Sequence, residues 1–337
     1  MDKINQTETI AGSEVLIRSL IAEGVDTIFG YPGGAIMPVF DALYGHKHEI
    51  RHILVRHEQG ALHAAQGYAR VSKKVGVALV TSGPGATNAI TGITDAMMDS
   101  TPLVVISGQV NSTLLGSDAF QEADVIGVTQ PITKWAYQIR RAEDIAWAVS
   151  RAFYIASSGR PGPVVLDIAK DAQVLKSDYS YQKTTFLRSY HPLPQVEEER
   201  IKMAADIINS AQKPFALVGQ GVVLGNAEQE LRAFLEKGGI PFGSTILGLS
   251  AQLTFGYIPY VVIAISIIKD IIQNDIVCIA TIERVPSWPK RISKSFVRLL
   301  ITASMDIHVM IAQNLKKRNA HFLYGFFIFR YNSMIVP

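Results

Sequence analysis

Residues 51–61 read Arg51-His52-Ile53-Leu54-Val55-Arg56-His57-Glu58-Gln59-Gly60-Ala61, and they place a carboxylate, Glu58, where a strand gives way to a helix. Residues 51–55 are typical of a short buried strand, whereas apolar residues recur at helical spacing from Ala61 to Tyr68. Open α/β folds bind ligands at the carboxyl ends of their strands. A carboxyl group buried there beside a helix N-terminus can exchange a proton with a heteroaromatic ring. The alternative is a surface acid that merely complements the helix dipole.

Short apolar runs alternate with amphipathic stretches along the first 170 residues. The predicted strands are residues 27–29, 51–55, 75–80, 103–106 and 164–167. The predicted helices are residues 13–22, 35–44, 60–71, 86–98 and 142–157. Continuously apolar strands separated by helices indicate a parallel sheet covered on both faces. We therefore predict an α/β fold with a doubly wound parallel sheet.

The chain divides into four segments by composition. Residues 1–175 carry the predicted sheet, and residues 176–195 are polar and aperiodic, which is typical of a linker. Residues 196–250 begin a second, partial α/β domain with expected helices at 197–212 and 226–237. Residues 251–337 hold only two of the 26 glycines and ten Lys and Arg against four Asp and Glu. We interpret this divergent tail as the product of a shifted reading frame or a truncated and rejoined gene.

Composition excludes several classes of protein. The net charge of +3 without a long basic stripe argues against a nucleic-acid partner. The single cysteine, Cys278, excludes a disulfide framework and fits a reducing compartment. The polar start lacks the apolar region of a secretory signal, and the apolar runs at 261–268 and 322–337 are too short to span a bilayer. A cytoplasmic protein without membrane contact is expected.

Five motifs follow one another through the first 175 residues. They are Phe29-Gly30-Tyr31-Pro32-Gly33-Gly34-Ala35, Thr81-Ser82-Gly83-Pro84-Gly85-Ala86-Thr87-Asn88, Ser107-Gly108-Gln109-Val110, Asp118-Ala119-Phe120-Gln121-Glu122 and Gly159-Arg160-Pro161-Gly162-Pro163. In this order and at these spacings they resemble the amino-terminal half of thiamine-diphosphate enzymes. The nearest resemblance is to the large, catalytic subunit of acetolactate synthase, and it runs from about Thr9 to about Ser250.

The resemblance implies a binding site for the aminopyrimidine ring of thiamine diphosphate. Glu58 would hydrogen-bond N1′ of that ring, so that the cofactor's own 4′-amino group becomes the base. The turn at Tyr31, Gly33 and Gly34 would approach the reacting centre, where glycine avoids a collision or allows φ > 0; the alternative is a plain strand–helix turn. The loop from Thr81 to Asn88, with Pro84, would form the wall around the ring and a dimer contact. A phosphate-binding P-loop is excluded because its lysine is absent.

The resemblance assigns the remaining site residues to substrates and to FAD. Gln121 joins Glu58 as a catalytic residue, Phe120 lies near the second-substrate pocket and Lys170 lies near its entrance; ordinary surface or core roles are the alternative. Arg160 would contact a structural FAD, and Gly219 and Gly221 would form a loop beside it. Most FAD-contacting sequence of the family would lie beyond residue 250, so FAD retention is an open question.

Metal binding is expected outside this chain. The histidines at 46, 48, 52, 57 and 63 do not have metal-ligand spacing. The resemblance implies that Mg²⁺ holds the diphosphate through Gly-Asp-Gly and paired asparagines of a carboxy-terminal domain, and neither motif occurs here. An active site of this family forms between two subunits. A homodimer or tetramer is therefore expected, with a small regulatory subunit as a further partner.

The resemblance implies condensation of two pyruvates to 2-acetolactate and CO₂, or of pyruvate with 2-oxobutyrate, in branched-chain amino-acid biosynthesis. Because the diphosphate half is missing, we expect the chain to be inactive by itself. One alternative is a catalytically inactive fragment that only dimerises or binds other subunits. Another is a related thiamine-dependent 2-oxoacid decarboxylase or oxidase, which Asp118-Ala119-Phe120-Gln121-Glu122 and Lys134 disfavour.

Overall fold

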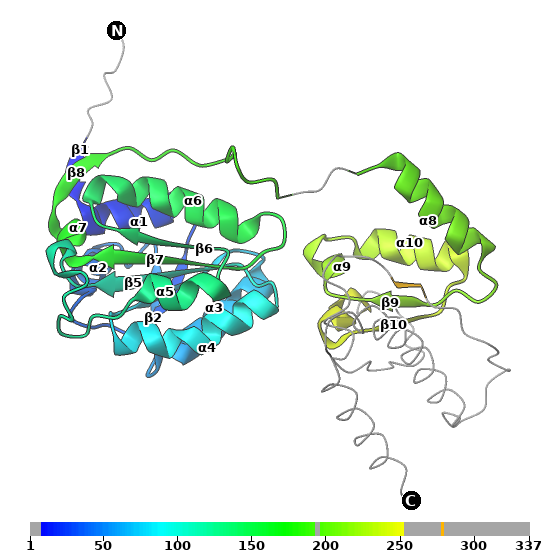
Figure 1. The fold of residues 1–337 in the computed structure, drawn as a ribbon, viewed down its shortest axis with the longest axis horizontal. Helices are drawn as coiled ribbons and strands as arrows, with labels where there is room; N and C mark the ends of the chain where they lie inside the picture. Colours follow the sequence, from blue (N-terminus) through cyan, green and yellow to red (C-terminus); the bar gives the residue numbers. More distant parts are fainter. Residues whose placement is uncertain (1–7, 193–195, 253–277, 280–337) are drawn as a thin grey trace, which may run out of the picture. The chain divides into compact units, whose positions relative to one another are not determined.

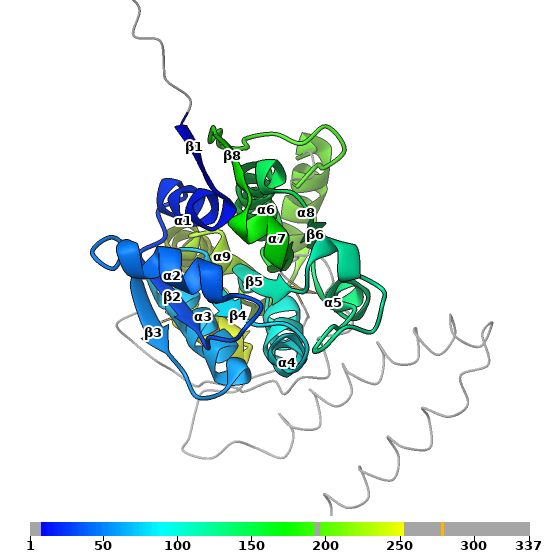
Figure 2. The same ribbon diagram turned by 90° about the vertical axis from the view of Figure 1, so that its left-hand side faces the viewer.

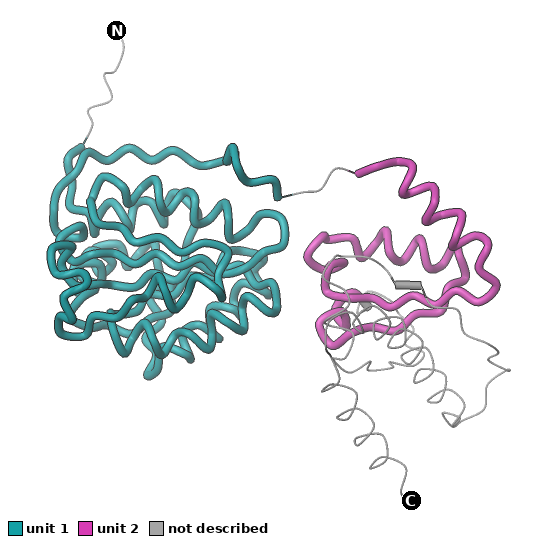
Figure 3. The backbone as a smooth tube through the Cα atoms, viewed as in Figure 1, with its two compact units in different colours: residues 1–195 teal, residues 196–337 magenta. Residues whose placement is uncertain are grey.

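The computed structural model describes residues 8–192, 196–252 and 278–279. The chain forms two units, residues 1–195 and 196–337 (Figure 3), and each is considered by itself. Within the described ranges, no helix is both long enough and apolar enough to cross a membrane.

A six-stranded, entirely parallel sheet forms the centre of the first unit, in the order β3-β2-β4-β5-β7-β6. The strands are β2 (Thr27–Gly30), β3 (Arg51–Leu54), β4 (Gly76–Val80), β5 (Leu103–Gln109), β6 (Trp135–Ile139) and β7 (Pro163–Ala169). Every residue of β4, β5 and β7 is buried, because helices cover both faces of these inner strands. The predicted doubly wound parallel sheet is confirmed.

Two sets of helices cover the two faces of this sheet (Figures 1 and 2). The helices α1 (Gly12–Ala22), α2 (Met37–Gly45), α6 (Ile145–Ser157) and α7 (Lys170–Val174) lie on one face. The helices α3 (Glu58–Ser72), α4 (Pro84–Met98) and α5 (Val125–Thr129) lie on the other. Short 3₁₀ turns occur at Ser112–Leu114, Gln130–Ile132 and Ala142–Asp144. The resulting two apolar cores sandwich the sheet.

The strand β3 is not the buried strand that its apolar sequence predicts. It lies at the edge of the sheet with β2 as its one neighbour, and Leu54 is 63% exposed. At an edge, only part of each residue is covered by neighbouring elements, which a short apolar run cannot reveal.

The segment predicted as a linker contains a strand. Residues Lys176–Tyr179 form β8, which pairs antiparallel with β1 (Glu8–Ala11). Beyond β8, the chain stays attached to the first unit, since the Ser150 hydroxyl donates to the carbonyl of Gln182 at 2.8 Å and the Lys134 ammonium to the Tyr190 hydroxyl at 3.0 Å. The polar, aperiodic sequence of this segment therefore predicted a linker where the chain in fact packs against the first unit.

The second unit is a smaller α/β arrangement. Its elements are α8 (Glu198–Ser210), β9 (Ala216–Val218), α9 (Gly221–Leu224), α10 (Glu228–Gly238), β10 (Phe242–Ser244), a 3₁₀ turn (Ile246–Gln252) and β11 (Cys278–Ile279). The strand β9 pairs in parallel with β10 and antiparallel with β11. Leu231 and Leu235 of α10 pack on β9 in its core. Apart from residues 251–252 and β11, the predicted divergent tail lies outside the described residues.

Candidate functional site

The strand order reverses between β2 and β4, because β3 lies on one side of β2 and β4 on the other; the carboxyl ends of these two strands, with the loops that leave them, are here called the crevice. The loops that leave β2 and β4 approach closely here. A Cβ atom built at Gly30 would lie 2.4 Å from the carbonyl oxygen of Leu79, and one at Gly33 would lie 2.5 Å from Cβ of Thr81. Glycine is therefore required by protein packing at both positions. Such a switch point is where open α/β sheets bind ligands.

The predicted turn residues occupy this crevice, with one correction. Tyr31 is 41% exposed, and its amide donates to the carbonyl of Leu79 at 3.2 Å. Of the two reasons expected for a glycine at position 34, a left-handed φ is absent, and a Cβ atom there would meet no protein atom within 4 Å, so a collision with a ligand stays a prediction. At Gly33 the collision is with Thr81 of the same chain. Only a ligand or a partner could require a glycine at position 34.

Glu58 is the first residue of α3, two residues earlier than the predicted helix start. His57 precedes it in an extended conformation and caps the helix, with Nδ1 accepting a hydrogen bond from the amide of Gln59 at 3.2 Å. The amide of Val55 donates to the carbonyl of Gly30 at 3.1 Å, which ties the strand–helix junction to the crevice. Glu58 is only 7% exposed. The sequence therefore positions a nearly buried acid at the switch point.

Asn88 holds one oxygen of the Glu58 carboxyl group. Its side-chain amide Nδ2 donates to Oε2 at 2.9 Å, so α4 and α3 are joined across 30 residues of sequence. The other oxygen, Oε1, accepts no hydrogen bond from any residue that the structure describes. A Cβ atom at Gly85 would lie 3.4 Å from Oε1 and 2.7 Å from Cγ2 of Thr81. Glycine at position 85 thus keeps a side chain away from this carboxyl oxygen.

The same arrangement leaves the site chemically incomplete. Oε1 is not among the buried polar atoms that lack a partner, so it lies where water or a ligand can reach it. Here the helix N-terminus favours an anion, Asn88 supplies one donor and Oε1 remains available. The geometry suits a ligand with a ring nitrogen that can donate or accept one proton.

Gln121 packs against the loop before α4 and so lies at the same edge of the sheet as Glu58. Gly83 has a left-handed φ of +53°, and a Cβ atom there would lie 2.6 Å from the carbonyl oxygen of Gln121. Gln121 is itself left-handed, with φ of +58°. The Glu122 carboxylate stabilises this turn by accepting the amides of Gly116 at 2.5 Å and Ala119 at 3.0 Å, and these bonds lower its pKa.

Phe120 and Lys170 are available to a ligand at this edge. Phe120 is 87% exposed and directly precedes Gln121, so its ring is open to a ligand. Lys170 begins α7 directly after β7, and its amide donates to the carbonyl of Val110 at 3.3 Å. Both residues are therefore close to the carboxyl ends of strands.

The predicted FAD residues are not part of this crevice. The Arg160 guanidinium donates from Nε to the Ser100 hydroxyl at 2.6 Å and from Nη2 to the Met98 carbonyl at 3.1 Å, at the end of α4 opposite Asn88. Gly221 begins α9 in the second unit, and a Cβ atom at Gly219 would meet nothing within 4 Å.

Asp167 is a buried acid that sequence reasoning treated only as part of a strand. It is fully buried on β7, and its Oδ2 accepts the side-chain amides of Gln109 and Gln138, each at 3.2 Å. Its Oδ1 has no partner, and burial raises the pKa of this carboxyl to about 7. The available signal was an acid within the otherwise apolar run of residues 163–169.

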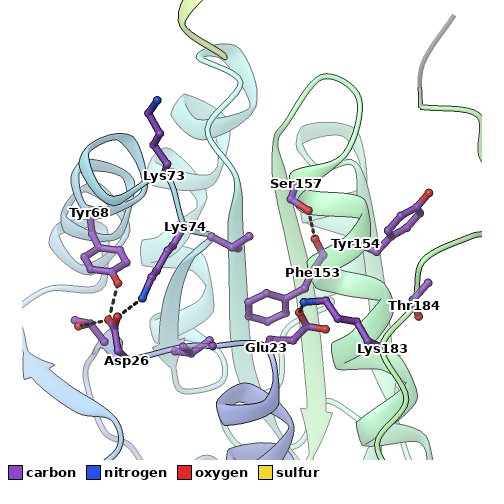
Figure 4. A pocket seen from close by; sticks show the side chains of 14 residues that line it. Glu23, Asp26, Tyr68, Lys73, Lys74, Phe153, Tyr154, Ser157, Lys183 and Thr184 are labelled. Carbon is purple, nitrogen blue, oxygen red and sulfur yellow. Dashed lines mark hydrogen bonds and ion pairs between the residues drawn. The ribbon is translucent and has the colours of Figure 1, made fainter. Parts of the chain in front are cut away.

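A separate hollow of about 420 Å³ lies where β2 and β4 begin, at the opposite edge of the sheet from Glu58 (Figure 4). Its charged side chains pair with one another. Lys74 contacts Asp26, and Lys183 reaches Glu23 at 3.2 Å. We assign no function to it. Nor do the residues that the structure describes bring together three or more His, Cys, Asp or Glu side chains that could hold a metal ion.

Comparisons with known proteins agree with the geometry of the crevice. The family model described as "Thiamine pyrophosphate enzyme, N-terminal TPP binding domain" matches residues 10–128. The model described as "Thiamine pyrophosphate enzyme, central domain" matches residues 201–252. The chain belongs to the thiamine pyrophosphate enzymes. Glu58, Asn88, Gly33 and Gln121 all lie within the first match, which makes the crevice the candidate cofactor site of this family member.

Curated relatives are acetolactate synthase large subunits. The chain is 50% identical over 246 residues to the one from Buchnera aphidicola subsp. Schizaphis graminum, covering 72% of this chain and 43% of the relative. It is 48% identical over 242 residues to that of Corynebacterium glutamicum, covering 72% and 38%. It is 46% identical over 246 residues to the isozyme 3 large subunit of Escherichia coli, covering 72% and 43%. The chain thus spans about two fifths of the length of the curated relatives it matches.

Proposed function

We propose that this chain supplies the aminopyrimidine-binding half of an acetolactate synthase large subunit. The observation that carries the proposal is the available Oε1 of the nearly buried Glu58, beside the glycine at position 85. The residues fit thiamine diphosphate because a carboxyl oxygen is the group that can bind and protonate a ring nitrogen. When bound, the cofactor supplies the electron sink for decarboxylating a 2-oxoacid.

Each side chain of the crevice has a distinct task in this proposal. Glu58 binds the ring nitrogen and holds or releases a proton at Oε1. Asn88 fixes the carboxyl orientation through Oε2. Tyr31, Gly33 and Gly34 and the loop with Pro84 bring the main chain close to the ligand. Gln121 acts beside the reacting atoms, while Phe120 and Lys170 contact the 2-oxoacid.

The reaction proposed is the condensation of two pyruvates to 2-acetolactate and CO₂, with 2-oxobutyrate as an alternative acceptor. The identity of 46–50% to acetolactate synthase large subunits supports this reaction over that of a related decarboxylase or oxidase. We further propose a cytoplasmic homodimer or tetramer with a regulatory subunit. Mg²⁺ would be bound outside the described residues. For a structural FAD, the candidate contact in the first unit is Arg160, and the candidate contacts in the second unit are Gly219 and Gly221, each unit being considered by itself.

Binding of the cofactor by the full chain tests the role of Glu58. Saturation-transfer NMR with thiamine diphosphate should show transfer to the pyrimidine protons. Glu58→Ala should weaken binding about tenfold or more, since a hydrogen bond to a charged group contributes roughly 1.5–3 kcal/mol. The matched control is Glu143→Ala, which removes an exposed acid from the turn before α6. Unchanged binding in Glu58→Ala, or an equal loss in Glu143→Ala, would refute the proposed site.

A second candidate function is a subunit-binding module without turnover. The observation that favours it is that the two family-model matches end at residue 252, so residues 253–337 match neither. An acetolactate assay with pyruvate, Mg²⁺ and thiamine diphosphate separates the two functions. Turnover by the purified chain supports the enzyme, whereas no turnover together with a dimer in sedimentation supports the module.

A further inference from the structure

Asp167 lies at the centre of a buried polar network in the sheet. It is opposite Ser107 on β5 and opposite Gln138 on β6 in the strand register. Both Gln109 and Gln138 donate to the same carboxyl oxygen, Oδ2, at 3.2 Å. A polar group in this position costs stability unless it is hydrogen-bonded. A network built around one acid between two glutamines is therefore a feature that packing alone does not require.

The two glutamines differ in what else they hold. Nε2 of Gln109 also donates to the carbonyl oxygen of Ala123 at 2.9 Å, and its Oε1 accepts the amide of Val110 at 2.9 Å. Gln138 has no such contact with Ala123; its Oε1 instead accepts from Arg140. Asp167 thus fixes the orientation of Gln109, and Gln109 in turn fixes the main chain at Ala123.

Ala123 ends the segment that carries Gln121. This segment, residues 116–123, has left-handed backbone at two non-glycine residues, Asp118 and Gln121, which costs free energy unless the surroundings hold it. Its carbonyl at Gln121 packs against Gly83, in the same loop as Gly85 above Glu58. The network therefore reaches the candidate site through one continuous set of contacts.

We propose that Asp167 is a positioning residue of the site: through Gln109 it holds residues 116–123 so that Gln121 lies against the loop over Glu58. This inference rests on the proposed function for its purpose, but the positioning itself is a property of the free chain. Asp167 touches no ligand in this scheme and acts only through Gln109.

Hydrogen exchange of the full chain without cofactor tests the positioning. Gln109→Leu and Asp167→Leu should each speed exchange of amides in residues 116–123 at least tenfold. Gln138→Leu, the matched control, removes the other bond to Oδ2 and should change that exchange less than twofold. Asp167→Asn retains an acceptor oxygen for both glutamines and should restore exchange to within about twofold of the native chain. If the proposal is right, hydrogen exchange of the β4 amides should be the same in each of these variants as in the native chain.

Two outcomes would overturn it. One is equal exchange in Gln109→Leu and Gln138→Leu, and the other is fast exchange in Asp167→Asn as in Asp167→Leu. If Asp167→Leu does not fold, the comparison of the two glutamine variants still decides. Adding thiamine diphosphate to the native chain tests the proposed function separately. If the cofactor does not bind, the proposed function fails, but hydrogen exchange in the free chain still tests the positioning by Asp167.

Discussion

The contact between α3 and α4 at Gly92 gives the sharpest prediction about the site. A Cβ atom at Gly92 would lie 2.3 Å from Cβ of Leu62 and 3.0 Å from its Cγ. Leu62 is fully buried, and truncating it to alanine would not remove the Cβ that collides. The two helices must therefore separate in Gly92→Ala. Because Glu58 and Asn88 lie on these helices, their 2.9 Å hydrogen bond should weaken with the separation.

The expected cost follows from two opposing terms. Alanine is better than glycine within a helix by about 1 kcal/mol, whereas overpacking a core costs about 1–3 kcal/mol. We expect Gly92→Ala to lower the free energy of unfolding by up to about 2 kcal/mol. The control is Gly67→Ala on the exposed side of α3, where a Cβ atom meets nothing within 4 Å; it should raise that free energy by up to about 1 kcal/mol.

Urea unfolding of both variants, followed by tryptophan fluorescence, measures the difference. Trp135 and Trp147 both lie in the first unit, next to one another. Thiamine diphosphate binding should also weaken in Gly92→Ala and stay unchanged in Gly67→Ala. If Gly92→Ala is as stable as Gly67→Ala, the helices accommodate a methyl group and the close approach is not what sets the geometry of the site.

Three further predictions concern charged groups of the first unit. Burial raises the pKa of Asp167 from 3.8 to about 7, so its contribution to stability is full below pH 4 and is lost as the pH rises to 7. In urea unfolding, the native chain should therefore lose roughly 3 kcal/mol of unfolding free energy between pH 5 and pH 8.5 through this group, and Asp167→Asn should not show that loss. Hydrogen bonds with Glu49 and Glu14 raise the pKa of His46, so His46→Gln should destabilise the chain at pH 5.5 more than at pH 8.5, and equal losses would contradict this. Lys134→Met should cost about 2 kcal/mol and speed limited proteolysis near Tyr190, because the ammonium donates to that hydroxyl and to the carbonyl of Ser158 at 2.7 Å; native-like cleavage would refute it.

The inner sheet could be predicted from sequence because each of its inner strands contains an uninterrupted apolar run, such as residues 103–106 of β5. Residues 76–80 and 163–169 are buried on both faces, so no polar alternation interrupts them. The strand at 135–139 was missed because it lies at the sheet edge with mixed polar and aromatic residues, which are only half buried. The same edge effect made the predicted burial of residues 51–55 wrong, although the predicted strand is present as β3. Burial at an edge depends on neighbours that a local pattern does not contain.

The site was predictable in its residues but not in its contacts. The strand–helix junction and the resemblance identified Glu58 and Asn88 separately. Their hydrogen bond depends on the distance between α3 and α4, which the absence of a side chain at Gly92 sets. Likewise, the acid at position 167 was visible, but its link to Ala123 through Gln109 requires the strand register. Long-range packing decides both features.

The burial of Glu58 is itself an argument that the crevice serves a ligand. Removing a carboxyl group from water costs several kcal/mol unless hydrogen bonds or charges compensate. In the described part of the chain, the compensation consists of one amide donor from Asn88 and the N-terminus of α3. By comparison, Glu122, which is not buried, has a backbone donor for each of its two oxygens, the amides of Gly116 and Ala119. A group that supplies the missing donor at Oε1 would remove the cost, and that is the part a ring nitrogen would play.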